Sequence, residues 1–203
     1  YEYLTEHVSM WNVAVERQIQ VKGPDAARLV DMVITRGVDK IEVGKARYVI
    51  LCNSYGGIIN DPVLLRLAED RIWLSRADSD LLLWAQGLAV NSGLEVSVSE
   101  PDVAPLQVQG PNSLDVMVAV FGEAVRELPY YGLLESEFEG LAIFISRSGW
   151  SGELGYEIYP TSSDRAEELW EALMALGQPF GIQPAAPNRI GRIEAGILDY
   201  SVD

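Results

Sequence analysis

The sequence predicts an α+β protein in which antiparallel sheets carry helices on one face. Three features favour this class. A unit of strand, Gly-Pro and amphipathic helix occurs twice, over 20–33 and 107–121. Residues 48–75 have the composition of short strands joined by turns, and residues 141–159 are typical of a hairpin. Because the unit occurs only twice, it indicates two related halves and not a solenoid.

In each copy of the repeat, a short strand runs into Gly-Pro and then into a helix. The first copy has Gly23-Pro24 and the second has Gly110-Pro111. Proline at the first helical position presets φ without losing a needed N–H. Apolar residues at helical spacing give each helix a core-facing side. They are Leu29, Val30 and Val33 in the first copy, and Leu114, Met117, Val118 and Phe121 in the second.

Strands are expected between the two copies over 48–52, 58–67 and 71–75, with Pro62 at an edge or a bulge. A helix capped by Asp78 or Ser79 should run to about Val90, and a strand should follow over 95–98. The apolar face of that helix would comprise Leu81, Leu82, Trp84, Ala85 and Leu88. After the second copy, we expect hairpin strands over 141–147 and 155–159, a helix ending at Leu176, and a last helix over roughly 187–200.

Composition excludes several classes of function. The chain has 203 residues, enough for one or two domains, and its formal net charge of −15 disfavours nucleic acid and anionic membranes as partners. Cys52 is the only cysteine and His7 the only histidine, so we expect neither an internal disulfide nor a metal site. Without an apolar run of membrane length or a basic-then-apolar leader, a cytoplasmic location is expected.

Two acids stand within runs that otherwise indicate buried strands. Asp61 follows Ile58-Ile59-Asn60, and Glu157 lies between Tyr156 and Ile158. A carboxylate on an apolar strand is costly to desolvate, so it needs a partner or a function. Together the two acids predict a pocket for a polar, nitrogen-rich ring. The structural alternatives are a turn carboxylate for Asp61 and an ion pair with Arg189 or Arg192 for Glu157.

Trp150 differs from the other tryptophans because it lies in a glycine-flanked loop, and we expect it to line a donor pocket. The remaining tryptophans lie in apolar-periodic segments and are expected in the core. They are Trp11, Trp73, Trp84 and Trp170.

Three motifs carry a resemblance to a known family. They are Gly56-Gly57-x-x-Asn60-Asp61, the run Arg147-Ser148-Gly149-Trp150-Ser151-Gly152-Glu153 with Tyr156-Glu157-Ile158, and Arg192-Ile193-Glu194-Ala195-Gly196. In this order the chain resembles the glycine-cleavage T-protein (aminomethyltransferase) superfamily over essentially its whole length. The stretches 60–67 and 77–84 look most like its tetrahydrofolate-dependent demethylase branch, which includes dimethylsulfoniopropionate demethylase and aryl-ether O-demethylases.

The resemblance implies two domains of a three-domain folate-binding cloverleaf, with the third domain missing. Residues 1–45 and 101–203 would form a discontinuous folate-binding domain, and residues 46–100 an inserted α+β domain that carries Asp61. The family pattern implies that Asp61 is the catalytic acid near the reacting folate nitrogen, and that Glu157 binds the pterin. The same pattern implies that the remaining tetrahydrofolate-binding residues are Tyr48, Ser75, Tyr159 and Arg192.

The implied reaction is methyl transfer from a small methylated S-, O- or N-compound to N5 of tetrahydrofolate. One alternative is aminomethyl transfer in glycine cleavage, which requires a lipoylated carrier protein as a partner. The T-protein pattern has two consecutive acids where this chain has Asn60-Asp61, which disfavours that alternative. The others are a non-catalytic folate-binding module and the folate module of a flavin-linked oxidase. For the last, the chain lacks a Gly-x-Gly-x-x-Gly fingerprint.

Overall fold

The computed structural model describes residues 1–76 and 80–203, and the chain forms two compact units. Unit 1 comprises Tyr1–Ala14 and Asp102–Leu198, and unit 2 comprises Val15–Pro101 and Asp199–Asp203. The first boundary differs from the expected one, because residues 15–45 belong to unit 2. Within them, the strand β2 (Arg17–Lys22) pairs with β7 (Arg71–Arg76) and β8 (Ser97–Ser99), which fixes it in the sheet of that unit.

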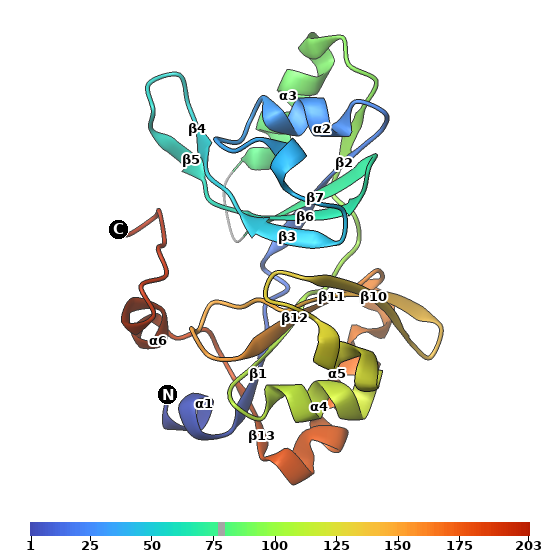
Figure 1. Cartoon of the computed structure of the whole chain (residues 1–203), viewed down its shortest axis with the longest axis vertical. Coiled ribbons are helices and arrows are strands. Elements are labelled where there is room, and N and C mark those ends of the chain that lie inside the picture. The colour runs from blue at the N-terminus through green and yellow to red at the C-terminus, as the bar shows by residue number, and fades with distance from the viewer. Residues whose placement is uncertain (77–79) are drawn as a thin grey trace. The chain divides into compact units, whose positions relative to one another are not determined.

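Unit 1 is built on a six-stranded sheet with strand order β10-β11-β12-β9-β1-β13 (Figure 1). Neighbouring strands are antiparallel except β1 and β13, which are parallel. The strands are β1 (Val8–Asn12), β9 (Leu106–Gln109), β10 (Leu133–Phe138), β11 (Leu141–Ser146), β12 (Gly155–Pro160) and β13 (Ile182–Ala185). The α-helices are α1 (Glu2–Glu6), α4 (Ser113–Phe121), α5 (Ala166–Gly177) and α6 (Arg189–Glu194). Short 3-10 turns are η2 (Glu123–Glu127), η3 (Ser163–Arg165) and η4 (Gln178–Phe180).

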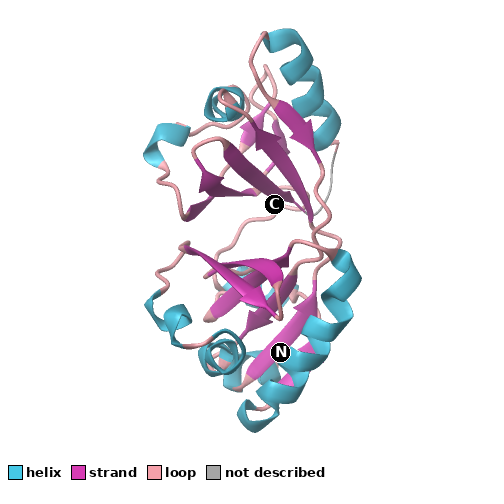
Figure 2. Ribbon diagram, turned by 90° about the vertical axis from the view of Figure 1, so that its right-hand side faces the viewer, coloured by secondary structure: helices cyan, strands magenta, loops and turns pink. Residues whose placement is uncertain are grey.

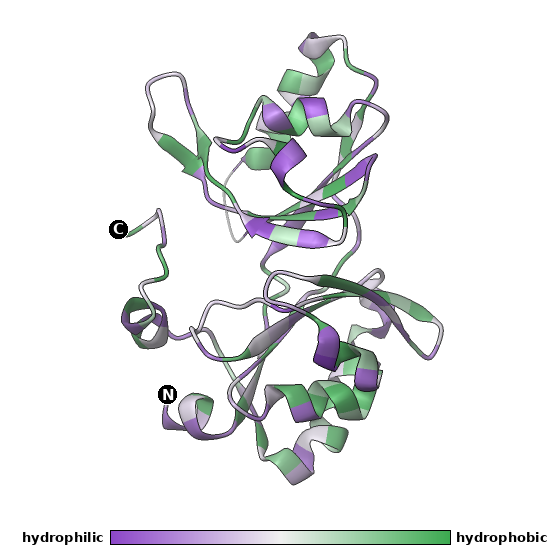
Figure 3. Ribbon diagram, in the orientation of Figure 1, coloured by the Kyte–Doolittle hydropathy of each residue, from purple (hydrophilic) through white to green (hydrophobic). Residues whose placement is uncertain are grey.

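The two faces of this sheet differ in chemistry because successive side chains of a strand point to opposite sides. One face is apolar and shares a core with α4 and α5, two helices along which hydrophobic and hydrophilic residues alternate (Figure 3). This core includes Met10, Val108, Ile145, Ile158, Met117 and Leu173. The side chains that alternate with these core residues point to the other face and are often polar. The buried polar residues among them include Ser9, Gln107, Gln109, Ser146 and Glu157. We call this second side the polar face.

Unit 2 has a five-stranded sheet of order β3-β6-β7-β2-β8 and a separate two-stranded sheet, β4-β5. Its further strands are β3 (Lys45–Tyr48), β4 (Leu51–Cys52), β5 (Ile58–Asn60) and β6 (Val63–Ala68). The helices are α2 (Ala26–Asp31) and α3 (Leu81–Ser92), with a 3-10 turn η1 (Val38–Lys40). Both α-helices pack on the sheet through a core that includes Ile19, Leu29, Leu64, Ile72 and Ala85. Strands and helices form distinct layers in each unit (Figure 2).

The expected α+β class is confirmed, and each unit contains one copy of the repeat. In unit 2 it is β2 followed by α2, and in unit 1 it is β9 followed by α4. The prolines, however, precede the capping residues Asp25 and Asn112 and do not occupy the first helical position. The glycines make the turns possible. Gly23 has φ +138° and Gly110 has φ +128°, values that favour glycine.

Several expected elements differ in extent. The run 58–67 is interrupted at Asp61-Pro62 and forms β5 and β6, and the run 48–52 likewise divides between β3 and β4. The last helix ends at Glu194 instead of near residue 200, and Gly196 follows with φ +68°. The strands β1, β10 and β13 were not anticipated. The predicted caps Asp78 and Ser79 lie outside the described residues.

Trp11 and Trp73 are fully buried and Trp170 packs against the core, as expected. Trp84 is 43% exposed, so its assignment to the core was wrong. No helix within the described part of the chain is long and apolar enough to cross a membrane.

Candidate functional site

Glu157 lies at the centre of the polar face, 5% exposed, and its bonding partners are neutral side chains. The amide nitrogen of Gln107 donates to Oε1 of Glu157 at 2.8 Å. The hydroxyl of Ser148 donates to Oε2, and the Oγ atoms of Ser148 and Ser146 lie 2.7 Å apart. Among the described residues, Glu157 bonds to Gln107 and Ser148, and the alternative of an ion pair between Glu157 and Arg189 or Arg192 is not seen.

Strand register explains why these groups meet. Ser146 on β11 pairs with Glu157 on β12, and Glu157 pairs with Gln107 on β9. Directly opposed residues of an antiparallel pair project from the same face, with Cβ atoms about 4.5–5.5 Å apart. Gln107 in turn pairs with Trp11 on β1, so four adjacent strands contribute one continuous row.

Burial raises the pKa of the Glu157 carboxyl, because the charged form loses its hydration. Hydrogen bonds from Ser148, Tyr159 and Gln107 act in the opposite direction, since each stabilises the carboxylate. Tyr159 lies two residues along β12 on the same face, and it is fully buried. The structure therefore places two of the predicted residues, Glu157 and Tyr159, on the same face of one strand.

The loop between β11 and β12 is held by Gln109. Its amide nitrogen donates to the carbonyl oxygen of Ser148 at 3.2 Å, and its Oε1 accepts from the hydroxyl of Ser151 at 2.7 Å. A Cβ atom on Gly149 or Gly155 would lie only 2.1 or 2.2 Å from the Gln109 side chain. The glycines of this motif therefore make room for the glutamine that fixes the loop.

Arg192 and Trp150, both predicted site residues, contact each other in unit 1. The guanidinium carbon of Arg192 lies 5.6 Å from the Trp150 ring centroid, within the range of a cation–π interaction. Arg192 is 3% exposed and also donates to the carbonyl oxygen of Ile197 at 3.0 Å. Arg192 is therefore a buried side chain and not a solvated charge on the helix surface.

Asp61 lies in unit 2, half-buried in the break between β5 and β6. The hydroxyl of Tyr48 donates to Oδ2 of Asp61 at 3.0 Å, and the backbone N–H of Tyr200 donates to the same oxygen at 3.4 Å. The amide nitrogen of Asn60 lies 3.4 Å from the Tyr200 hydroxyl. The structure thus brings together Asp61 and Tyr48, two predicted residues.

The pKa values of this pair are both raised. Partial burial raises the pKa of Asp61, and the hydrogen bonds from Tyr48 and Tyr200 oppose that shift. Burial, followed by the nearby charge of Asp61, raises the pKa of Tyr48 to about 12. Tyr48 is therefore a neutral hydrogen-bond donor at physiological pH, and Asp61 is the acceptor.

Ser75, the remaining predicted residue, is buried on β7 and accepts a hydrogen bond from Gln18 at 3.0 Å. The predicted residues are thus divided between the units. Asp61, Tyr48 and Ser75 belong to unit 2, and the others belong to unit 1.

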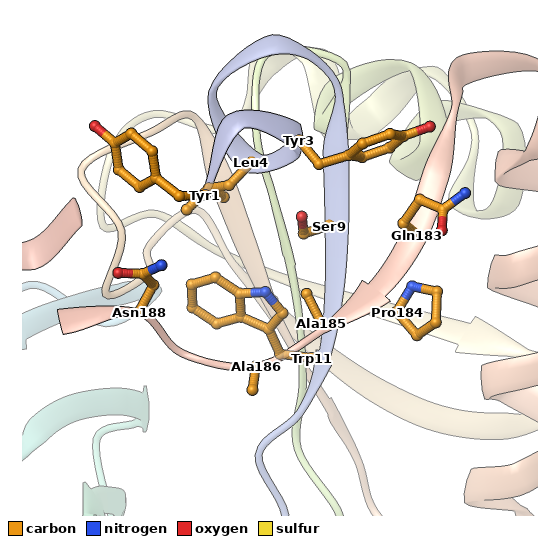
Figure 4. A pocket seen from close by; sticks show the side chains of 10 residues that line it. All are labelled: Tyr1, Tyr3, Leu4, Ser9, Trp11, Gln183, Pro184, Ala185, Ala186 and Asn188. Carbon is orange, nitrogen blue, oxygen red and sulfur yellow. The ribbon is translucent and has the colours of Figure 1, made fainter. Parts of the chain in front are cut away.

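A cavity of about 230 Å³ lies within unit 1, between the N-terminal segment and the segment 183–188 (Figure 4). None of the predicted site residues lines it. Trp11, which belongs to the row that contains Glu157, does line it, and Figure 4 shows its indole nitrogen on the side of the ring that faces Ser9.

Sequence reasoning missed Gln107 and Tyr200 as contributors. Gln107 carried a usable signal, because Gln107 and Gln109 alternate with the core residues Leu106 and Val108 along one strand. Tyr200 carried none, since it meets Asp61 across 139 positions of sequence through its backbone.

Comparison with known proteins shows to which family the chain belongs. The chain is 43% identical over 201 residues to dimethylsulfoniopropionate demethylase DmdA of Ruegeria pomeroyi. This match covers 99% of this chain and 55% of that protein. It is 34% identical over 193 residues to an aminomethyltransferase of Corynebacterium aurimucosum, with 90% and 52% covered. The chain therefore spans about half the length of the curated relatives it matches.

The crystal structure of glycine cleavage system aminomethyltransferase T from Bartonella henselae has the same fold, with a TM-score of 0.86 at 27% identity. That match covers 98% of this chain and 54% of the other. The family model described as the GCVT N-terminal domain matches residues 1–203. As the sequence motifs indicated, this chain belongs to the glycine-cleavage T-protein family and resembles its demethylase branch.

Proposed function

We propose that the protein is a tetrahydrofolate-dependent methyltransferase that demethylates a small methylated S-, O- or N-compound. The observation that carries the proposal is the buried carboxylate of Glu157, held by neutral donors on a polar sheet face. A structural carboxylate at such a position gains little, because its desolvation is costly. A ligand that presents N–H donors would supply the compensating bonds.

The residues of unit 1 fit the pterin ring of a folate. A carboxylate has about four acceptor sites, and those that Gln107, Ser148 and Tyr159 leave free would accept the adjacent N–H donors of a pterin edge. Charge-assisted hydrogen bonds of this kind are strong where water is excluded. We assign Tyr159 and Arg192, which belong to the same unit as Glu157, to this ligand. For Tyr48 and Ser75, folate binding stays a prediction from the family resemblance.

Asp61 is the residue that we assign to catalysis. Tetrahydrofolate, when bound, supplies the ring nitrogen that accepts the methyl group. The ionised carboxylate of Asp61 would stabilise the positive charge that develops during transfer and take up the released proton. The bond from Tyr48 orients this carboxylate and favours its ionised form.

The donor side of the reaction is assigned to Trp150. A sulfonium donor would pack its cationic centre well on an aromatic ring, whereas an aryl ether would need a proton donor for its leaving group. The greater identity to a demethylase than to the aminomethyltransferase favours methyl transfer.

The test measures tetrahydrofolate binding by calorimetry and product formation with a panel of methyl donors. The Glu157→Ala variant should lose binding, whereas Asp61→Asn should bind and fail to transfer. Unchanged tetrahydrofolate affinity in Glu157→Ala would overturn the proposal.

Aminomethyl transfer is the second candidate, because the curated relatives include aminomethyltransferases at 34% identity. This reaction would require a lipoylated carrier protein as the partner. Activity that depends on such a carrier would favour it, and methyl transfer without a carrier would exclude it.

A further inference from the structure

We infer that Ser148 and Gln107 are positioning residues that hold the Glu157 carboxylate in one orientation for the ligand. This inference rests on the proposed function, since it concerns the same binding group. It adds two residues that lie on different elements and act through Glu157.

The carboxylate is held from both sides. Gln107 approaches Oε1 from strand β9, whereas Ser148 approaches Oε2 from the loop that follows β11. A carboxylate with a donor on each oxygen cannot rotate about its last bond without losing one of them. The orientation of its remaining lone pairs is therefore fixed before a ligand arrives, which lowers the entropic cost of binding.

Ser146 supports Ser148. A hydroxyl has a single proton, and when Ser148 gives it to Glu157, its oxygen can accept the proton of Ser146 at 2.7 Å. Both serines are at most 4% exposed. The resulting chain runs from Ser146 through Ser148 to the carboxylate and aligns the donor.

Gln109 shows what a purely structural glutamine does on the same strand. It bonds to the carbonyl oxygens of Ser148 and Tyr156 and to the Ser151 hydroxyl, and so fastens the loop to the sheet. Gln107 instead donates to the buried carboxylate of Glu157. The fold alone does not need this acid, because an apolar residue at position 157 would avoid the cost of desolvating a charge. We therefore assign to Gln107 the positioning of Glu157, and to Gln109 the anchoring of the loop.

The consequence is measurable on Glu157 itself. Loss of a donor removes a bond that favours the charged form, so the pKa of Glu157 should move further upward. Tyr159, on the same strand, is the titratable side chain whose hydrogen bond also acts on this carboxyl, and it is retained in the variants below.

The experiment compares Ser148→Ala, Gln107→Leu and the conservative Ser148→Thr. The matched control is Ser113→Ala, which removes a buried serine hydroxyl that donates to the carbonyl oxygen of Leu154 at 3.0 Å in the same unit. Two quantities are measured: the titration midpoint of Glu157, from the ¹³C carboxyl shift of the free protein, and the tetrahydrofolate dissociation constant across pH.

Ser148→Ala and Gln107→Leu should each raise the Glu157 midpoint and weaken tetrahydrofolate binding about tenfold at neutral pH, the scale of a hydrogen bond to a charged group. The loss of tetrahydrofolate affinity should become smaller at higher pH. Ser148→Thr should keep the wild-type midpoint and affinity, because it retains the hydroxyl, and Ser113→Ala should change neither. If Ser148→Ala fails to fold, Gln107→Leu and Ser148→Thr still provide the comparison.

Wild-type affinity and midpoint in both donor variants, with binding lost in Glu157→Gln, would overturn the positioning roles and leave the proposed function intact. Wild-type affinity in Glu157→Gln would instead overturn the proposed function, and with it this inference.

Discussion

The hydroxyl of Tyr48 lies 3.0 Å from a carboxylate oxygen of Asp61, across the break in the strand run of unit 2. This bond lowers the pKa of Asp61 against the raising effect of burial. It therefore extends to lower pH the range over which Asp61 is ionised.

Replacement of Tyr48 by phenylalanine should move the acid limb of the pH–rate profile to higher pH. Without the phenol, the charged form of Asp61 loses a stabilising bond and its pKa rises. The rate on the acid limb should fall more than the rate on the plateau above it. Steady-state methyl transfer measured from pH 5 to 9 tests this expectation. An acid limb at the wild-type position would contradict it.

Glu157→Gln should separate stability from binding. The folded-state pKa of Glu157 is raised above its unfolded value, which is about 4.3. Such a group contributes stability that is fully present below the unfolded pKa and is lost as pH rises through the folded pKa. The neutral glutamine avoids that loss, so at neutral pH the variant should be more stable than wild type while it loses tetrahydrofolate affinity.

Urea unfolding of both proteins at several pH values provides the measurement. The stability difference should vanish below about pH 4, where both side chains are neutral. A variant that is less stable than wild type at pH 7 would show that the carboxylate of Glu157 stabilises the folded protein.

Trp150→Ala should raise the KM for the methyl donor and leave tetrahydrofolate affinity within about twofold. The ring contributes a donor surface, and its contact with Arg192 is worth about 0.5–2 kcal/mol. Trp150→Phe keeps an aromatic face, so its KM for the methyl donor should lie between those of wild type and Trp150→Ala. Wild-type rate and KM in Trp150→Ala would remove this residue from the donor site.

Gly155→Ala should destabilise unit 1, and a second substitution should partly restore it. A Cβ atom at Gly155 would lie 2.2 Å from Gln109, whose side chain is fully buried and bonded to the loop. Overpacking of this kind costs about 1–3 kcal/mol. The double variant Gly155→Ala/Gln109→Ala relieves the contact, so its destabilisation should be less than the sum of the single changes in thermal unfolding. Strict additivity would contradict the proposed contact.

The fold class and most element positions followed from local patterns. The two copies of strand, Gly-Pro and helix were found because the local order of residues encodes them. The assignment of residues 15–45 failed because the pairing of β2 with β7 and β8 is a long-range event that no local pattern reports. The strand β13 was missed for a related reason: its four residues include Pro184, and its partner β1 precedes it by more than 170 positions.

The candidate site divides in the same way. Asp61 and Glu157 were singled out because a charge in an apolar strand conflicts with burial, and that conflict is visible locally. Their partners were harder to find. Gln107 meets Glu157 only through strand register, and Tyr200 meets Asp61 through a backbone N–H that any residue type could supply.

The repeat predicts a contrast among glycines. Gly110→Ala should cost about 3 kcal/mol or more, because its φ of +128° is strained for alanine and a Cβ atom would lie 2.5 Å from the backbone oxygen of His7. Gly23→Ala meets the carbonyl oxygen of Glu95 at 2.4 Å and should behave alike. Gly56→Ala is the matched control, since φ is +81° there but no atom lies within 4 Å, so its cost should be about 1–2 kcal/mol. Chemical denaturation ranks the variants, and equal costs at Gly56 and Gly110 would show that close backbone approach is not what requires glycine in the repeat.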